Sequence, residues 1–338
     1  MTGTIDIHTH VVPSSFPAYR GIRKDVAWPS VVHQDCGHAC VYTGEKPFRA
    51  ITANSWNPRL RSEEMEASGI ARQALSPMPE LLSYWLQPDD AAILARHTND
   101  EIAQMVSADR ARFLGLGMVP LQSIDLAIRE LHYIAENECL HGIELGTNIN
   151  GKPIGHPDFA AFFAVVNELS LPVFVHALRP VGVERLVGGA MLEQVIAFPC
   201  ETAFAAASFV TGGIMQAHPD LRIAFSHGGG AFGQVLPRLQ FSWSMAPELQ
   251  EKLTLSPNEV ARKFFYDTLV YDEGALRYLI EKFGISQLMV GTDYPFLIMD
   301  REANQRIDRL GLSESEKRQI LRGNALRFFG LGFPQTST

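Results

Sequence analysis

Residues 4–10 read Thr-Ile-Asp-Ile-His-Thr-His. This short run, rich in β-branched residues, is typical of a strand buried in a parallel sheet. It ends in two histidines, where a doubly wound dinucleotide-binding fold would carry a glycine-rich turn. In an extended segment His8 and His10 project to the same side, so both imidazoles are able to bind one divalent ion. The stretch therefore predicts a first strand with metal-binding residues at its carboxyl end.

Seven further short apolar runs follow this strand, and helical patterns separate them. Runs that are apolar along their whole length are typical of parallel strands covered by helices on both faces. Eight strand–helix units predict an α/β fold, a (β/α)8 TIM barrel, rather than an open doubly wound sheet. The predicted strands are 4–8, 70–76, 113–119, 142–146, 172–176, 222–226, 264–267 and 288–291.

Residues 13–53 interrupt this alternation of strands and helices. The segment is rich in Pro, Gly, Cys and His, and short alternating runs such as Ala39–Thr43 predict a small β insertion after strand 1. We expect one barrel domain over residues 1–330 that contains the insertion, followed by a loose tail at 331–338.

Cysteine usage bears on the cellular compartment. Four cysteines in 338 residues do not make a disulfide framework, and the first residues lack the basic and apolar segments of a secretory signal. We therefore expect a cytoplasmic protein. Cys36 and Cys40, with His33 and His38, supply one ligand cluster of a zinc knuckle, but no second ligand pair follows at the usual spacing.

The charge balance argues against two classes of partner. With 29 Lys and Arg against 37 Asp and Glu, the net charge is −8, and the chain lacks the basic footprint of a nucleic-acid-binding protein. Residues 202–219 contain no charged side chain and are long enough to raise the question of a membrane span. Polar residues and two glycines interrupt this stretch, so we interpret it as a buried core helix ending near Gly212 and expect no membrane association.

Four predicted strands end in residues that bind metals or transfer protons. His8 and His10 end the first strand, His176 ends the fifth, His227 follows the sixth and Asp293 follows the eighth. Active sites of barrels lie at the carboxyl ends of the strands. Each residue alone has a structural explanation, such as a hydrogen-bonded core histidine or a turn-capping aspartate, but their coincidence favours one site. Three imidazoles and a carboxylate suit zinc with an open position, which leaves His227 as a general acid or base.

Several segments beyond these strand ends carry a family resemblance. They are Phe48-Arg49, Trp56-Asn57-Pro58, Glu63-Glu64-Met65, Val119–Gln122, Pro199–Thr202, His227–Gly230 with Arg238 eleven residues after His227, Gly291–Phe296 and Gly323-Asn324-Ala325. From Ile5 to Phe329 the sequence resembles the amidohydrolase superfamily. It is more closely similar to metal-dependent decarboxylases of the 2-amino-3-carboxymuconate-6-semialdehyde type. The two histidines are common to the superfamily, whereas the glycine triplet, the Arg238 spacing and the Asp-Tyr-Pro-Phe segment are more specific.

The resemblance implies roles for individual residues. His8, His10, His176 and Asp293 match the metal ligands of the family, and His227 matches its catalytic histidine. Asp293 would also act in catalysis by accepting a hydrogen bond from the water on the metal.

The resemblance also implies how substrate, metal and subunits are arranged. Arg49 and Arg238 match arginines that hold substrate carboxylates, and Phe296 matches a substrate contact. In that family the second arginine reaches the neighbouring site of a homodimer. The predicted strand 142–146 has no lysine of the kind that bridges two metals, so we expect one metal, zinc, with manganese as the alternative. A bridge through Glu144 is the remaining two-metal hypothesis.

The activity implied is non-oxidative decarboxylation of an unsaturated or aromatic carboxylic acid from aromatic catabolism. A metal-activated water and His227 as general acid or base would carry it out, and the order of hydroxide addition and protonation stays open. A metal-dependent hydrolase or hydratase on the same barrel is the alternative. A non-catalytic metal-binding protein is a further one, which the presence of His227 and both arginines disfavours.

One departure from the family concerns the substrate. His176 is followed by Ala-Leu-Arg-Pro, where the family has Pro-Trp. A large aromatic residue is missing and Arg179 is added near the expected metal. We predict that Arg179 meets a second anionic group on the substrate; the alternative is a solvated loop residue.

Overall fold

The first strand, β1 (Thr4–Val11), opens the barrel, and all eight of its residues are buried. In the computed structural model, which describes residues 3–23, 25–189 and 191–331, it pairs in parallel with β5 (Ile70–Pro77). The sheet continues through six further parallel strands and returns to β1, where Ile7 N–H donates to the Val290 carbonyl at 2.8 Å. These strands are β6 (Phe113–Gly117), β7 (Leu140–Gly146), β10 (Val173–His176), β11 (Ile223–Phe225), β12 (Phe265–Asp267) and β13 (Leu288–Met289).

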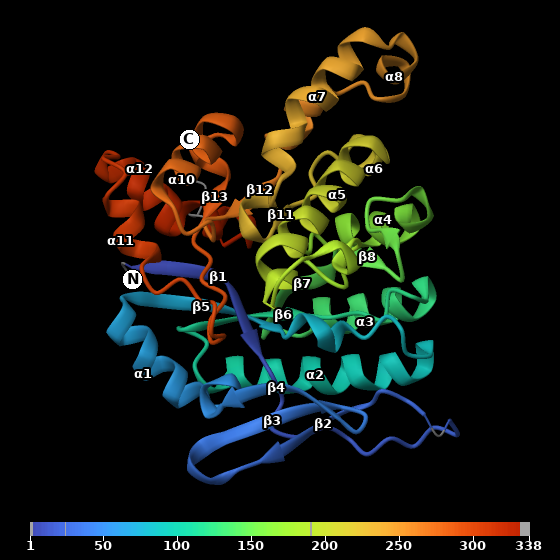
Figure 1. Ribbon diagram of the computed structural model, residues 1–338, viewed down its shortest axis with the longest axis vertical. Coiled ribbons are helices and arrows are strands. Elements are labelled where there is room, and N and C mark those ends of the chain that lie inside the picture. The colour runs from blue at the N-terminus through green and yellow to red at the C-terminus, as the bar shows by residue number, and fades with distance from the viewer. Residues whose placement is uncertain (1–2, 24, 190, 332–338) are drawn as a thin grey trace.

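Helices cover the outside of this ring (Figure 1), which confirms the predicted (β/α)8 barrel. Local sequence fixes their ends: Asn57 caps α1 by accepting from Arg59 N–H at 3.0 Å, and Gly69 ends it in the left-handed region. The longer helices are α1 (Pro58–Ser68), α2 (Pro88–Ala108), α3 (Ile124–Glu136), α4 (Ala160–Glu168), α5 (Phe198–Thr211), α7 (Phe232–Met245) and α10 (Glu273–Phe283). The shorter ones are α6 (Ile214–Ala217), α8 (Pro247–Lys252), α9 (Pro257–Ala261), α11 (Ala303–Asp308), α12 (Glu314–Arg318) and α13 (Asn324–Phe328).

The barrel interior is filled by apolar side chains below the site. Residues from seven of the strands join α13 in one buried cluster, which includes Ile5, Ile7, Phe174 and Phe265. Phe328 of α13 packs on Phe265, with ring centroids 5.3 Å apart. The interior is therefore a packed core rather than a channel, as in other barrels.

An irregularity in β1 aims the two histidines. The β1–β5 register shifts between Asp6 and Thr9. Ile7 packs in the interior cluster, yet its neighbour His8 also points inward to the site. Side chains of a regular strand alternate between its faces, so adjacent residues point inward together only where the register breaks.

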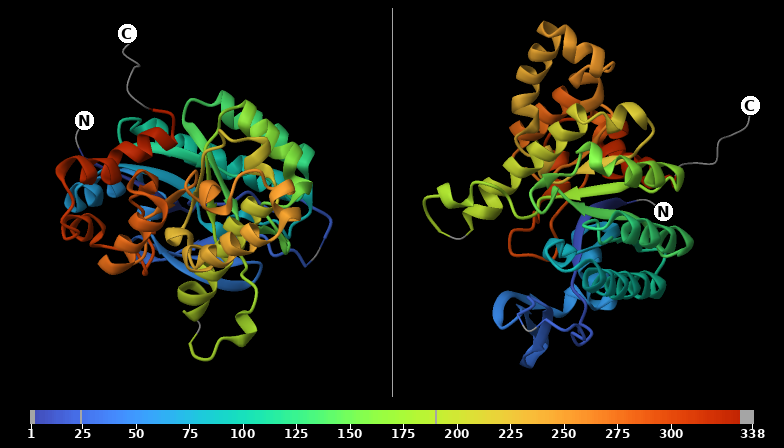
Figure 2. Two further views of the ribbon diagram at one scale, coloured as in Figure 1. Left: turned by 90° about the horizontal axis from the view of Figure 1, so that it is seen from above. Right: turned by 90° about the vertical axis from the view of Figure 1, so that its right-hand side faces the viewer.

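The predicted β insertion after strand 1 is confirmed as a three-stranded antiparallel sheet of β2 (Pro29–His33), β3 (His38–Thr43) and β4 (Lys46–Thr52). Ala39, Val41 and Ile51 are buried and join the main core, so the insertion packs on the barrel. Figure 2 shows this sheet and the segment between β10 and α5 extending on the same side of the barrel. The side chain of Cys36 and the tail at 332–338 lie outside the described residues.

The helix expected near residues 202–211 is α5, which ends at Thr211 before Gly212. With the preceding π-helical turn, η6 (Glu193–Ala197), it forms the one helix of the described chain, Glu193–Thr211, that is long and apolar enough to cross a membrane. Half of this segment is buried. Phe209 packs between Phe163 and Phe225, as expected of a core helix.

Candidate metal centre and active site

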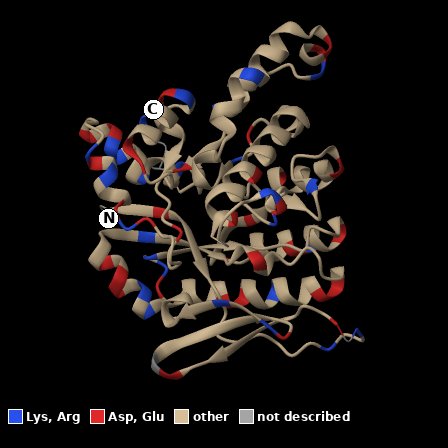
Figure 3. Ribbon diagram, in the orientation of Figure 1, with Lys and Arg blue, Asp and Glu red and all other residues tan. Residues whose placement is uncertain are grey.

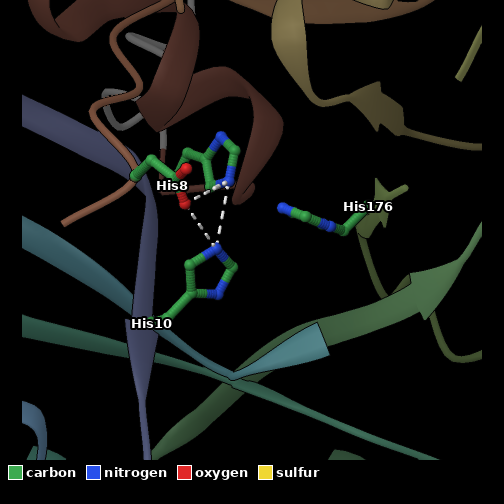
Figure 4. A group of neighbouring side chains, drawn as sticks. His8, His10 and His176 are labelled. Atoms are coloured by element: carbon green, nitrogen blue, oxygen red, sulfur yellow. Dashed lines mark hydrogen bonds and ion pairs between the residues drawn. The ribbon is translucent and has the colours of Figure 1, made fainter. Parts of the chain in front are cut away.

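Four side chains converge at the carboxyl ends of the strands. His8 and His10 come from β1 and His176 ends β10 (Figure 4), and Asp293 follows β13 in the chain. One ligand atom of each lies within 4.8 Å of the others. His10 Nε2 is 3.1 Å from both His8 Nε2 and Asp293 Oδ1. All four residues are buried, and the structure therefore brings together the residues expected as metal ligands.

The hydrogen bonds of these histidines show what the group is built to hold. His8 Nδ1 lies 2.6 Å from Asp267 Oδ2, and the Nδ1 atoms of His10 and His176 lie 3.0 and 2.8 Å from backbone carbonyl oxygens. Because these acceptors take the Nδ1 protons, each neutral ring has its lone pair on Nε2. His176 Nε2 is buried and has no hydrogen-bond partner. Three converging lone pairs and a carboxylate fit a divalent metal.

The charges around the group favour a cation at this point. Burial lowers the pKa of His8, but the hydrogen bond to Asp267 and the charges of Asp267, Asp293 and Glu144 raise it to about 9. Burial raises the pKa of Asp293, but its hydrogen bond with His10 and the charge of His8 outweigh this and hold the pKa below its usual value. Positive charge is thus stabilised where a divalent metal would bind.

His227 stands beside this group and begins a tight turn after β11. Its ring centroid lies 5.1 Å from that of His176. Burial and the charge of His8 lower the pKa of His227 to about 4. The imidazole is therefore neutral near pH 7 and has a lone pair that is able to accept a proton.

The turn that carries His227 depends on its glycines and on one carboxylate. His227 has φ +57, and Gly228, Gly229 and Gly230 also have positive φ. A Cβ on Gly230 would lie 1.8 Å from the nearest backbone oxygen, so only glycine fits there. Asp267 accepts hydrogen bonds from the His227 and Gly228 N–H groups at 3.0 and 2.8 Å.

The insertion contributes a cation to the edge of the site. Arg49, on β4, lies with NH2 3.2 Å from Glu80 Oε1 and with its guanidinium 4.3 Å from the centre of the Phe296 ring. Phe296 in turn stacks on His10, with ring centroids 5.1 Å apart. A cavity of ≈ 330 Å³, called the inner cavity below, is lined by residues that include Arg49, Glu80, His176, His227, Asp293 and Phe296.

The sequence of the whole chain matches one family. The amidohydrolase family profile matches residues 5–331. A 2-amino-3-carboxymuconate-6-semialdehyde decarboxylase of Dictyostelium discoideum is 36% identical over 97% of this chain and 91% of its own length. The chain belongs to the amidohydrolase family. The expected enzyme class, a carboxy-lyase of the amidohydrolase superfamily, is confirmed at this level.

Solved structures agree with the fold of this amidohydrolase. The 5-carboxyvanillate decarboxylase of Sphingomonas paucimobilis is 29% identical, with a TM-score of 0.73 over 80% of this chain and 82% of that one. The Metarhizium anisopliae protein called IDCase superposes with a TM-score of 0.83 over 97% of both chains at 22% identity. The second similarity concerns the fold alone.

Two of the expected substrate residues of this amidohydrolase lie away from the inner cavity. Arg238 is exposed on α7, the helix that projects from the barrel in Figure 1, and it is outside the cavity linings formed by the described residues. Arg179 follows β10 and lines an outer cavity, where its guanidinium lies 3.4 Å from the centre of the Trp85 ring.

Sequence reasoning gave no role to three residues that complete the site. Asp267 ends β12 and contacts both His8 and the His227 turn. An aspartate at the end of a predicted strand was a signal that would have found it. Glu80 and Trp85 follow β5, and only the fold brings them to Arg49 and Arg179.

We predict that Asp267→Asn lowers metal affinity about 10- to 100-fold. Both oxygens of Asp267 accept from N–H donors, including His8 Nδ1 at 2.6 Å and Gly228 N–H at 2.8 Å. An amide would place an NH2 group against one set of these donors. Zinc titration in competition with a chelator measures the effect.

The matched control is Asp272→Asn, which makes the same change at an exposed helix cap. This variant should bind zinc as the parent protein does. Equal affinity of both variants would show that Asp267 does not orient His8 for metal binding.

Proposed function

We propose that this amidohydrolase is a metal-dependent non-oxidative decarboxylase of an unsaturated or aromatic carboxylic acid. His8, His10, His176 and Asp293 hold one divalent metal, and Asp293 and His227 act in the reaction. The observation that carries the proposal is the convergence of three Nε2 atoms and a carboxylate within 4.8 Å, beside a neutral histidine and an arginine.

A divalent metal bound by these four residues supplies Lewis acidity and lowers the pKa of a bound water toward neutrality. Arg49 holds the substrate carboxylate, because a planar guanidinium donates two parallel hydrogen bonds to it. Phe296, which contacts both Arg49 and His10, contributes apolar surface to the cavity that would hold a conjugated substrate.

His227 transfers the proton that decarboxylation requires. When the bond between the substrate carbon and its carboxylate breaks, the electron pair stays on that carbon and carbon dioxide leaves. One proton then takes the place of the carboxylate. His227 is buried, neutral and lines the same cavity as Arg49, so it is placed to accept a proton and to return it.

We further propose a homodimer in which Arg238 reaches the neighbouring site. Arg238 is exposed on α7 rather than in the inner cavity of its own chain. On the same helix, Phe241 and Met245 have exposed fractions of 67% and 68%. Large apolar side chains gathered on a projecting helix mark a protein–protein contact, and a second copy of this chain is the occupant proposed.

Zinc is the metal we propose, with manganese as the alternative, because imidazole ligands suit zinc well. We also propose a cytoplasmic protein that associates with neither membranes nor nucleic acids. Figure 3 shows Lys and Arg interspersed with Asp and Glu along the ribbon, and the net charge of −8 does not favour binding to nucleic acid.

The proposal predicts about one metal ion per chain and stoichiometric carbon dioxide from at least one acid. Elemental analysis of the purified protein gives the metal content. A panel of carboxymuconate semialdehydes and hydroxybenzoates, assayed for carbon dioxide, gives the activity. Bound metal without carbon dioxide from any acid would favour the hydrolase or hydratase alternative, which releases an acid and no gas.

We expect His227→Ala to retain the metal and to lose turnover by about 10²- to 10⁴-fold, the usual contribution of a general acid or base. Metal content and kcat are measured on the same preparation. His132→Ala, at an exposed histidine on α3, is the matched control and should retain both. Loss of metal from His227→Ala would make this histidine a ligand and overturn its assignment.

Mixing two inactive variants tests the shared site. Arg49→Ala and Arg238→Ala subunits each lack one arginine, but a mixed dimer contains one complete site if Arg238 acts across the interface. After unfolding and refolding together, half of the dimers are mixed and about a quarter of the parental activity should return. No recovery, with mixed dimers demonstrated by tags of different mass, would place both arginines in the same subunit's site.

A further inference from the structure

The guanidinium carbon of Arg179 lies over the indole of Trp85, 3.4 Å from the ring centre. Stacking on an aromatic face fixes the plane of a guanidinium and leaves its in-plane N–H donors free to bind an anion. Among the described residues, no hydrogen bond or ion pair joins Arg179 to an acidic side chain.

The backbone around Arg179 is held in an unusual conformation. Arg179 has φ +43, a left-handed value that few non-glycine residues adopt. The carbonyl of Leu178 accepts from Asn148 Nδ2 at 2.8 Å, and the Val181 N–H donates to Glu201 Oε2 at 3.2 Å. Asn148 and Glu201 are buried and joined by a 3.0 Å hydrogen bond. Both sides of Arg179 are therefore fixed, as expected where a strained residue aims a functional side chain.

Arg179 and Trp85 line an outer cavity of ≈ 1910 Å³ that is adjacent to the inner one. The two cavities share Arg49, Glu80 and Phe296. The inner cavity holds His176, His227 and Asp293, whereas Arg179 lines only the outer one. A long ligand with one end at the metal group would pass Arg49 and extend toward Arg179.

We propose that Arg179, seated on Trp85, binds a second anionic group of the substrate in the outer cavity. This inference rests on the proposed function and assigns a binding residue to the acidic group that is not lost. One carboxylate leaves as carbon dioxide at the inner site, and the other stays ionised on Arg179. Arg179 is then a specificity-determining residue and takes no part in proton transfer.

Matched pairs of acids, one with a single carboxylate and one with two, test the subsite by calorimetry on the zinc-loaded protein. The pairs are benzoate with isophthalate, trans,trans-hexa-2,4-dienoate with trans,trans-muconate, and biphenyl-4-carboxylate with biphenyl-4,4′-dicarboxylate. They span increasing lengths. In at least one pair the dianion should bind about tenfold more tightly, the contribution of a hydrogen-bonded ion pair.

Arg179→Met keeps an unbranched stem on Trp85 and removes the charge. This variant should bind the preferred dianion about tenfold more weakly and should bind the matching monoanion with unchanged affinity. Arg185→Met is the matched control, because it removes an exposed arginine from the same segment and should change neither. Trp85→Leu should reduce the difference in affinity between dianion and monoanion. Trp85→Phe keeps an aromatic ring beneath Arg179 and should retain most of this difference.

If Arg179→Met leaves the ratio of the two dissociation constants unchanged in every pair of acids, Arg179 does not bind the second anionic group and the proposed subsite is wrong. An equal loss of dianion affinity in Arg185→Met would show that the effect comes from the change in net charge and not from a contact with Arg179. Binding is measured without turnover, so the subsite is testable even if no acid releases carbon dioxide. Conversely, carbon dioxide from a monoacid without any dianion preference would support the decarboxylase and reject this subsite.

Discussion

Three buried imidazole rings that face one point at the barrel mouth are the constraint on which the rest of the structure depends. The Nδ1 atoms of His8, His10 and His176 are each engaged by an acceptor behind them, so their Nε2 atoms must converge. Such an arrangement is unfavourable without positive charge between the nitrogens, and Asp293 adds a carboxylate to it. The register break in β1, which turns His8 and His10 inward, follows from the same requirement.

One buried carboxylate joins metal binding to proton transfer. Asp267 orients His8 through Nδ1 and holds the His227 turn through two backbone N–H groups. A histidine in the left-handed region keeps that conformation only when its surroundings fix it. The proposed general base and the candidate metal centre therefore contact the same residue, and we expect both to be impaired when it is changed.

The residues proposed to select the substrate come from segments around the barrel mouth rather than from the barrel strands. Arg49 comes from the β insertion, Phe296 from the loop after β13, and Arg179 and Trp85 from loops beyond β10 and β5. Barrels commonly change substrate through such loops while the strand ends keep the chemistry. The Ala-Leu-Arg-Pro segment after His176 lies in such a loop, and it places Arg179 in the lining of the outer cavity.

The sequence by itself determined the eight strands, the β insertion and the residues that meet at the strand ends. Parallel strands bring their carboxyl ends to one face, so His8, His176, His227 and Asp293 were predictable neighbours. Only the tertiary structure decided the contacts of Asp267, the pairing of Arg49 with Glu80 and the stacking of Arg179 on Trp85. Strand and helix periodicity reports which face a residue occupies, but it does not report how loops far apart in the chain fold over the barrel mouth. These contacts therefore depend on packing between segments that local patterns describe separately.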